Sequence, residues 1–526
     1  MISMMAMNAT EIQAQGVVPA QKGEKAFTLE DLNFGGHNYR NMVAKNRWCT
    51  WWGNELIRQD VEACYLVNKA TGKETKLFGI NDINQWIAPT KDIKVRALYN
   101  AQFPFAGKSI VMVNNGSKTY TIDFKKHKLV SEMDFEDGEN LLEANAQQNA
   151  SVDFMGFRYR DTSVSAPQLA LRQWQNLANA GSVSLYIMGH LGNHQDRTAL
   201  TASKPAFDFH KAHEKLYAGL TSAAKVLLVN RPVMARNDPE SYGWIRALTE
   251  SHIPFDEMKL AELKPELLHR WDVVILADLK KLTQEQAEMF DTYTEQGGTV
   301  LSTGILPELR CLGICEVRNS WKDRMSSVFE LCEAEKTLFP RSAEAHYIAP
   351  GAILNEVVFC EQTQTCLHLI PEHPFGPPER CYYTEVSDIP GVGVTPYGKG
   401  KGVCLPWLAG SFYFNEGFDN TLHLIQDVLH QICGLPELAP GLHPSVELVL
   451  CKKTDRFLVQ LINGSGVFAN SYFRPIPMQK IELHLPGMAG KSVKALNGGT
   501  GVAQSAGDAL IITLDQLNEY EAIEIF

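Results

Sequence analysis

The sequence lacks a long apolar run, and this absence limits the classes of protein it can encode. No stretch of 18 or more apolar residues occurs in the 526 residues, so we expect no transmembrane helix and no membrane partner. The first residues, MISMMAMNATEIQAQGVVPAQKGEKA, have no charged n-region, and polar residues interrupt their apolar part. They make a poor signal peptide, and we expect residues 1–25 to be a disordered leader.

Basic residues are also scarce relative to acidic ones. Lys and Arg total 49 against 60 Asp and Glu, which gives a formal net charge of −11. A nucleic-acid partner is not expected, because binding to a phosphate backbone needs clustered cations. The hydrophobic content of 45% and the charged content of 21% are ordinary for a globular protein.

Cysteine spacing gives no sign of a metal site. The eleven cysteines are odd in number and irregularly spaced, and no Cys-x-x-Cys occurs. The closest pair, Cys311 and Cys315, has no matching His or Cys pair nearby. This pattern predicts buried free thiols in a reducing compartment, which favours the cytoplasm over the periplasm or secretion. We expect no metal and no cofactor.

Sequence motifs for nucleophilic catalysis are missing as well. A serine hydrolase needs a G-x-S-x-G elbow, and Gly464-Ser465-Gly466 is only a hairpin turn. An amidotransferase-like domain would need a Cys after the apolar strand 272–277, where Asp278 stands instead. The Gly-rich stretch 397–402 has no Ser or Thr after its Lys, so it predicts a tight turn and not a phosphate loop.

The pattern of apolar residues predicts an α/β multidomain fold. Continuous apolar strands at 225–230, 272–277 and 299–302 alternate with helices, which is typical of a parallel sheet covered on both faces. Thr283 is expected to cap a helix that ends before Gly297. The expected domains are a β-rich propeller-like fragment (26–150), the end of a partial (β/α) barrel (151–222), a flavodoxin-like parallel-sheet domain (223–440) and a C-terminal β-sandwich (441–526).

Polar side chains follow two predicted strands of the barrel-like part, 154–159 and 184–188. In a (β/α)₈ barrel the carboxyl ends of the strands carry the active site, and carboxylates there suit sugar hydroxyls. The candidate residues for a substrate groove are Arg158, Arg160, Asp161, His190, His194, Asp196 and Arg197. The alternative is that they are ordinary loop residues, because the sequence offers no convincing pair of catalytic carboxylates.

Three tryptophans near the start of the chain allow two interpretations. Trp48, Trp51 and Trp52 could stack on a sugar or a peptide. Aromatic residues more often fill a hydrophobic core, and this is the expectation here.

Two family resemblances meet in the chain. Residues 26–153 resemble the N-terminal start of the dipeptidyl peptidase IV family of Bacteroides-type bacteria, through AFTLEDLNFGGHNYRNM, WCTWWGNELIRQDVEACYLVNKATGKETKLF, VRALYNAQFP and YTIDFKKHKLV. This resemblance implies the opening strands of a β-propeller. The hydrolase domain of that family is absent, so peptidase activity is not implied.

From about Phe154 the sequence resembles glycoside-hydrolase-like proteins with a TIM-type barrel and a β-galactosidase trimerisation-like domain. The stretches that carry this are FRYRDTSVSAPQLALRQWQNLANAG, SYGWIRALTESHIPFDEM, WDVVILADLKKLT, YTEQGGTVLSTG, HPFGPPER, YGKGKGVCLPW and LNEYEAIEIF. The first β/α units of the barrel, where most catalytic positions of the family would lie, are missing.

The resemblances therefore imply a glycoside-hydrolase-related protein of carbohydrate metabolism that is catalytically incomplete. A carbohydrate ligand and a homo-oligomer are the expected partners. Two alternatives stay open, namely an N-terminal module of a dipeptidyl peptidase IV-like peptidase and a non-catalytic oligomerisation protein.

Overall fold

The computed structural model describes most of the chain. The residues described are 48–87, 95–115, 118–134, 151–152, 161–179, 181, 183–186, 195–230, 238–322, 327–351, 353–373 and 376–526. The chain forms two compact units, Met1–Asp134 and Phe135–Phe526. Both helices and strands are present and strands predominate in the described residues, which confirms the mixed α/β character. The expected leader, residues 1–25, lies outside them.

The first unit consists of two antiparallel meanders. One sheet has the order β1 (Trp48–Trp52), β2 (Glu55–Gln59), β3 (Ala63–Val67) and β4 (Glu74–Gly79), and the other β5 (Ile110–Asn115), β6 (Lys118–Asp123) and β7 (Lys128–Asp134). Helix α4 (Ile80–Ile87) follows β4. The ring centroid of Phe78 lies 6.2 Å from that of Phe103 and 5.4 Å from that of Phe124, and the three rings belong to the hydrophobic core of this unit. Strands β5 and β6 pair antiparallel, from Ile110 opposite Asp123 to Asn115 opposite Lys118.

The three tryptophans of β1 differ in burial. The Trp52 Nε1 donates to the carbonyl oxygens of Phe105 (3.2 Å) and Lys108 (2.8 Å), and its ring packs on Phe124 at 5.2 Å. Trp48 and Trp51 are 40% and 59% exposed. The expectation of a core role is therefore correct for Trp52 and wrong for the exposed Trp48 and Trp51.

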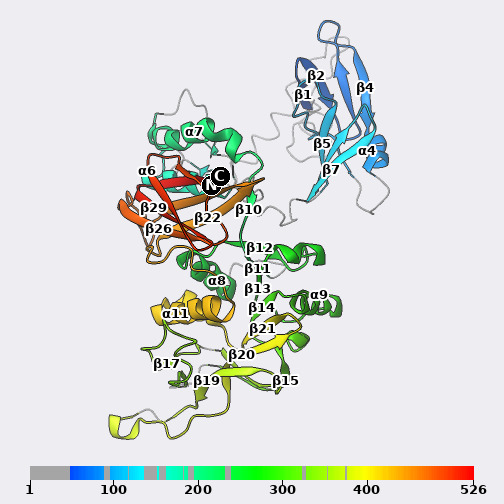
Figure 1. Cartoon of the computed structure of the whole chain (residues 1–526). Helices are drawn as coiled ribbons and strands as arrows, with labels where there is room; N and C mark the ends of the chain where they lie inside the picture. Colours follow the sequence, from blue (N-terminus) through cyan, green and yellow to red (C-terminus); the bar gives the residue numbers. More distant parts are fainter. Residues whose placement is uncertain are drawn as a thin grey trace, which may run out of the picture. The chain divides into compact units, whose positions relative to one another are not determined.

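The second unit contains a nine-stranded sheet (Figure 1). Its parallel part has the order β12 (Phe255–Lys259), β11 (Val226–Asn230), β13 (Val273–Ala277), β14 (Thr299–Thr303) and β21 (Gly400–Leu405). The antiparallel strands β20 (Pro390–Tyr397), β19 (Gln364–Ile370), β16 (Val328–Glu330) and β17 (Tyr347–Ile348) continue it. Every residue of β13 and of β14 is buried, as a strand covered on both faces requires.

Helices cover both faces of this sheet (Figure 1). One face packs under α8 (Pro239–Glu250), α10 (Ala409–Glu416), α11 (Asp419–Asp427) and the π-helical turn η7 (Val428–Ile432). The other face packs under α9 (Gln284–Glu295) and the 3₁₀ turn η4 (Pro265–Arg270). The predicted cap of α9 is confirmed, because Thr283 and Gln286 exchange side-chain to backbone bonds at 3.0 and 3.2 Å.

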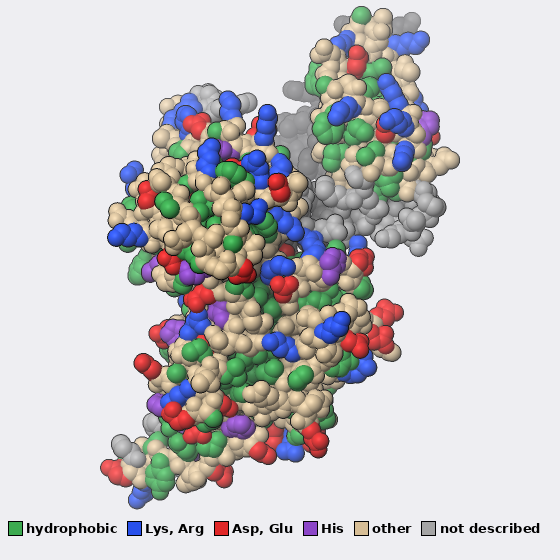
Figure 2. All heavy atoms as spheres, in the orientation of Figure 1, with side chains coloured by type: hydrophobic (Ala, Val, Ile, Leu, Met, Phe, Trp, Pro, Cys, Tyr) green, Lys and Arg blue, Asp and Glu red, His purple; other side chains and the backbone are tan. Residues whose placement is uncertain are grey.

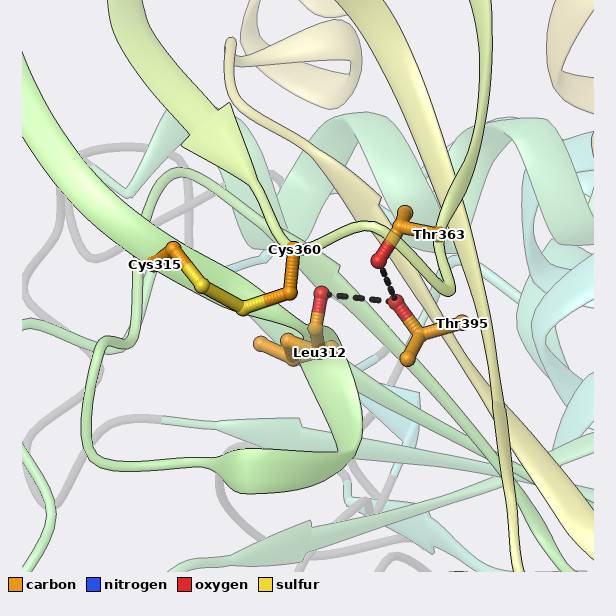
Figure 3. Close-up of a disulfide and its surroundings, with 5 residues drawn as sticks. All are labelled: Leu312, Cys315, Cys360, Thr363 and Thr395. Atoms are coloured by element: carbon orange, nitrogen blue, oxygen red, sulfur yellow. Dashed lines mark hydrogen bonds between the residues drawn. A yellow bond between two sulfur atoms is a disulfide. The ribbon is translucent and has the colours of Figure 1, made fainter.

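A disulfide corrects the expectation for the cysteines (Figure 3). Cys315 is bonded to Cys360, which joins the start of β15 (Ile314–Lys322) to the residue after its partner strand β18 (Ile353–Phe359). Beside it the Thr395 hydroxyl donates to the Leu312 carbonyl oxygen (3.0 Å). The prediction of free buried thiols is wrong for this pair and for the exposed Cys49 and Cys332. Cys381 is free but only half-buried, and six others are free and buried: Cys64, Cys311, Cys366, Cys404, Cys433 and Cys451.

The C-terminal part consists of two antiparallel sheets that share one core. The first has the order β10 (Thr221–Ser222), β22 (Val446–Lys453), β23 (Arg456–Asn463), β30 (Tyr520–Ile525) and β27 (Val493–Ala495). The second has the order β26 (Met478–Leu485), β29 (Ala509–Leu517) and β28 (Gly501–Ala506). Val459 and Leu461 of the first sheet pack with Leu483 and Ile512 of the second. A small hairpin, β24 (Val467–Phe468) and β25 (Ser471–Tyr472), projects from them.

The helical segment before the parallel sheet packs on the outer face of the five-stranded sheet. It contains α6 (Ala166–Ala178), α7 (Thr198–Tyr217) and the short parallel strands β8 (Ser151–Val152) and β9 (Leu185–Tyr186). Trp174 of α6 stacks on Tyr520 at 4.5 Å, and the hydroxyl groups of Tyr217 and Tyr520 lie 2.6 Å apart beside Gln460. The residues described here form no closed barrel.

Two shorter helical turns complete the described structure, η5 (Arg310–Leu312) and η6 (Pro378–Arg380). No helix in the described ranges is long and apolar enough to cross a membrane. On the face drawn in Figure 2, Lys and Arg side chains are interspersed with Asp and Glu.

Candidate functional site

The structure describes only three of the seven residues predicted to line a substrate groove. Arg158, Arg160, His190 and His194 lie outside the described residues. Asp161 is exposed, and Arg197 is exposed directly before α7. Asp196 precedes it and is half-buried.

Asp196 acts on the backbone around it. Its two carboxylate oxygens accept hydrogen bonds from the backbone N–H groups of Ser163 (2.9 Å) and Thr198 (3.0 Å). These bonds lower the pKa of Asp196 to about 2, because they stabilise the ionised form. Asp196 thus joins the turn at Asp161 to the first turn of α7. A carboxylate this acidic is ionised near neutral pH and cannot act there as a proton donor. That it lines a substrate groove stays a prediction.

A partly open cavity of about 210 Å³ lies elsewhere in the second unit. We call it the junction cavity, because its lining comes from the end of α6, the edge strand β12 and the strands β10 and β22. The lining residues are Asn179, Ser222, Ala224, Thr249, Ile253, Pro254, Phe255, Asp256, Glu257, Glu447, Leu448, Val449 and Leu450. None of them was predicted as a site residue from the sequence.

Two strand edges bound the junction cavity. Strand β12 is the last strand of the parallel sheet and pairs only with β11. The pairing of β10 with β22 is short, from Thr221 opposite Lys452 to the bond from Ala223 N to Leu450 O (2.9 Å). Because β10 stops there, the stretch of β22 from Glu447 to Val449 presents its edge to the cavity, opposite β12.

Two of the carboxyl groups that line the cavity are held by neighbouring side chains. The Asp256 Oδ2 accepts a bond of 2.7 Å from the Trp271 indole N–H, and Asp256 is 8% exposed. The Glu447 Oε1 accepts a bond of 2.5 Å from the Gln175 Nε2. Burial raises the pKa of each group above its ordinary value, although the bonds to Ser222 and Trp271 lower that of Asp256 and the bond to Gln175 lowers that of Glu447.

Another buried carboxyl group, that of Glu240, lies where the parallel strands end. The Glu240 Oε1 accepts from the Trp244 indole N–H (2.8 Å), and its Oε2 accepts from the Ser411 backbone N–H (2.6 Å) at the start of α10. Burial raises its pKa to about 7, against the effect of these bonds. A Cβ on Gly243 would lie 1.8 Å from the Gly410 carbonyl oxygen, so α8 and α10 cross in direct backbone contact. Glu240 therefore joins two helices.

The turn after β13, where an amidotransferase-like domain would carry its nucleophile, carries Asp278. Asp278 has a φ of 47°, its backbone N–H donates to the Thr303 hydroxyl (3.2 Å), and both carboxylate oxygens lie 2.6 Å from the Lys280 Nζ. Burial raises the pKa of the Cys404 thiol to about 12, so this nearby thiol stays protonated.

Among the described residues, no group of three or more His, Cys, Asp or Glu could hold a metal ion.

Neither a protein-family model nor a curated protein matches the chain. Its fold is similar to α-L-fucosidase isoenzyme 2 from Paenibacillus thiaminolyticus, with a TM-score of 0.58 and 17% identity over 73% of this chain and 61% of that one. A β-galactosidase from Bacillus circulans sp. alkalophilus matches with a TM-score of 0.45 and 13% identity, over 67% of this chain and 53% of that one.

A putative dipeptidyl aminopeptidase IV from Bacteroides ovatus matches at 33% identity over 22% of this chain and 16% of its own, with a TM-score of 0.20. Both resemblances expected from the sequence thus recur among solved structures. The chain spans 61% of the fucosidase. What it shares with that enzyme is the fold.

Proposed function

We propose that the chain is a glycoside-hydrolase-related protein of carbohydrate metabolism that binds a carbohydrate and lacks a complete catalytic centre of its own. The supporting observation is the likeness to the fucosidase, which covers 73% of this chain but only 61% of that enzyme. Function taken from a shared fold is an analogy, so the proposal also depends on the site. Asp196 belongs to the predicted groove, but its carboxylate accepts hydrogen bonds from the backbone N–H groups of Ser163 and Thr198. This contact supports a structural role for Asp196.

The same proposal assigns a role to each part of the chain. Residues 151–222 are the end of a TIM-type barrel, residues 223–440 a flavodoxin-like domain of the β-galactosidase trimerisation type, and residues 441–526 a β-sandwich. The parallel order of β12, β11, β13, β14 and β21, with helices on both faces, supports the second assignment. The meanders β1–β4 and β5–β7 support a propeller-like fragment at residues 26–150.

A turnover assay tests the catalytic part of the proposal. The full chain at micromolar concentration is incubated with p-nitrophenyl α-L-fucoside and p-nitrophenyl β-D-galactoside, and release of nitrophenol is followed for hours. We expect the native chain to release nitrophenol no faster than boiled protein does. Turnover that disappears in Asp161→Asn but persists in Asp208→Asn, a matched change of an exposed aspartate on α7, would instead show a working groove. A dipeptide-nitroanilide substrate tests the peptidase alternative, and no cleavage is expected.

Self-association through residues 223–440 is a second candidate function, supported by exposed aromatic side chains. Tyr347, Tyr382, Phe414 and Phe418 are 44%, 60%, 44% and 50% exposed. Sedimentation velocity at micromolar concentration is expected to show an oligomer that Tyr382→Ser combined with Phe418→Ser dissociates. A strictly monomeric wild-type chain would count against this function, and Phe468→Ser, at an exposed position on the C-terminal hairpin, serves as the control.

A further inference from the structure

The junction cavity has the position and the composition of a ligand site. Ligand pockets occur preferentially where domains meet and combine an apolar lining with a few fixed polar groups. The cavity lies where α6, the parallel sheet and the C-terminal sheet come together. Its apolar lining includes Ile253, Phe255 and Leu448, and its polar lining includes hydroxyl, amide and carboxyl groups.

The polar groups of the cavity are held in place before any ligand arrives. The bond from the Trp271 indole to Asp256 fixes one carboxyl group, and the bond from Gln175 to Glu447 fixes the other. An ionised carboxylate offers about four acceptor sites, so the bonds from Trp271 and Ser222 to Asp256, and from Gln175 to Glu447, leave each group able to accept more. Pre-organised acceptors of this kind lower the entropic cost of binding.

We propose that the junction cavity binds one monosaccharide ring, with Asp256 and Glu447 accepting hydrogen bonds from its hydroxyl groups and Ile253 and Phe255 against its C–H face. A sugar carries several hydroxyl donors around an apolar ring, which matches a lining that mixes carboxyl, hydroxyl and aliphatic groups. The inference names the site at which the proposed carbohydrate function is exercised and rests on that function.

The ligand chemistry also explains why two carboxyl groups are kept in a partly buried position. Burial without a donor is unfavourable for a carboxylate, because the charged form loses its hydration. The raised pKa of both groups reflects this cost. Hydroxyl donors from a bound sugar would replace the lost water.

Calorimetric titration of the full chain with L-fucose and with D-galactose tests the inference. Two variants change the cavity in different ways. Glu447→Gln removes one charged acceptor at nearly constant shape, and Thr249→Phe places a ring in the cavity from the end of α8. Glu288→Gln is the matched control, because Glu288 lines a separate groove beside α9. Melting curves and circular dichroism establish that each variant is folded.

We expect at least one of the two sugars to bind, with the same affinity for the wild-type chain and for the control Glu288→Gln. Glu447→Gln replaces a charged acceptor with a neutral amide, so it should weaken binding by at least about tenfold. Thr249→Phe should abolish it. Carboxyl footprinting of the wild type with glycine ethyl ester needs no folded variant, and the sugar should lower labelling of Glu447 but not of Glu288.

The outcomes separate this inference from the function on which it rests. Binding that both cavity variants retain, with unchanged labelling of Glu447, would overturn the inference and leave a carbohydrate-binding protein whose site lies elsewhere. No binding of either sugar by the wild type would overturn the proposed carbohydrate function, and the inference with it.

Discussion

Removing the Cys315–Cys360 disulfide should destabilise the parallel-sheet part of the chain by about 2–4 kcal/mol. The bond closes a loop with a sequence separation of 45 residues. Loop-closure entropy of −2.1 − 1.5R ln n cal/mol/K then corresponds to about 4 kcal/mol at 25 °C. The lower figure allows for residual structure in the unfolded chain, which reduces the entropy that the bond removes.

The test compares Cys315→Ser/Cys360→Ser with the wild type in urea, followed by tryptophan fluorescence. Trp321 on β15 lies close to the bond in sequence and packs partly against the main core, so it reports on this part of the fold. Cys332→Ser changes an exposed free thiol and should leave the midpoint where it is. Equal midpoints for the double variant and the wild type, or eleven titratable thiols in the denatured oxidised chain, would refute the reasoning.

Three other changes test contacts within the second unit. Burial raises the pKa of Glu240 to about 7, so the wild type is most stable below the unfolded pKa and loses about 3 kcal/mol of unfolding free energy as pH rises from 4.5 to 7. Glu240→Gln should remove this pH dependence, and melting temperatures measured against pH test the difference. Gly243→Ala should cost more than about 2 kcal/mol in urea unfolding, because its Cβ would meet the Gly410 carbonyl oxygen, whereas Gly376→Ala meets nothing within 4 Å and should be neutral. Tyr520→Phe removes a buried hydroxyl that bonds two neighbours and should lower stability by about 1–3 kcal/mol, and a change under about 0.3 kcal/mol would contradict that role.

The parts of the fold predicted from the sequence are those whose signals are local. Helix α9 was predicted within one residue at each end, because Thr283, Gln286 and Gly297 lie next to the positions they specify. Strands β13 and β14 were predicted because full burial on both faces demands a continuous apolar run.

Elements that depend on distant partners were missed or misplaced. Strand β15 is exposed along most of its length and is held by pairing with β18, so its sequence has no alternation to detect. Its register also brings Cys315 to Cys360, which spacing along the chain cannot reveal.

The junction cavity could not be predicted from any one segment, because its polar groups belong to strands that are adjacent only in the folded chain. Asp256 is part of the strand FDEMK, in which it alternates with less buried positions and shares the buried face with Met258. An aspartate on a buried face is a signal that sequence reading could have used. Its partner group comes from Glu447, almost two hundred positions later, and each is fixed by a third segment, at Trp271 and at Gln175.

The expected domain boundaries also separated residues that act together. A boundary placed at 222 divides Ser222, on the strand that joins the C-terminal sheet, from Asp256, on the edge of the parallel sheet. Both line the same cavity. A shortened chain that starts at 223 would keep the parallel sheet and β22 but lose Asn179 and Ser222 from the cavity lining. Sugar binding should therefore require residues on both sides of 222 in one chain, whereas a site confined to the parallel-sheet domain would survive its isolation.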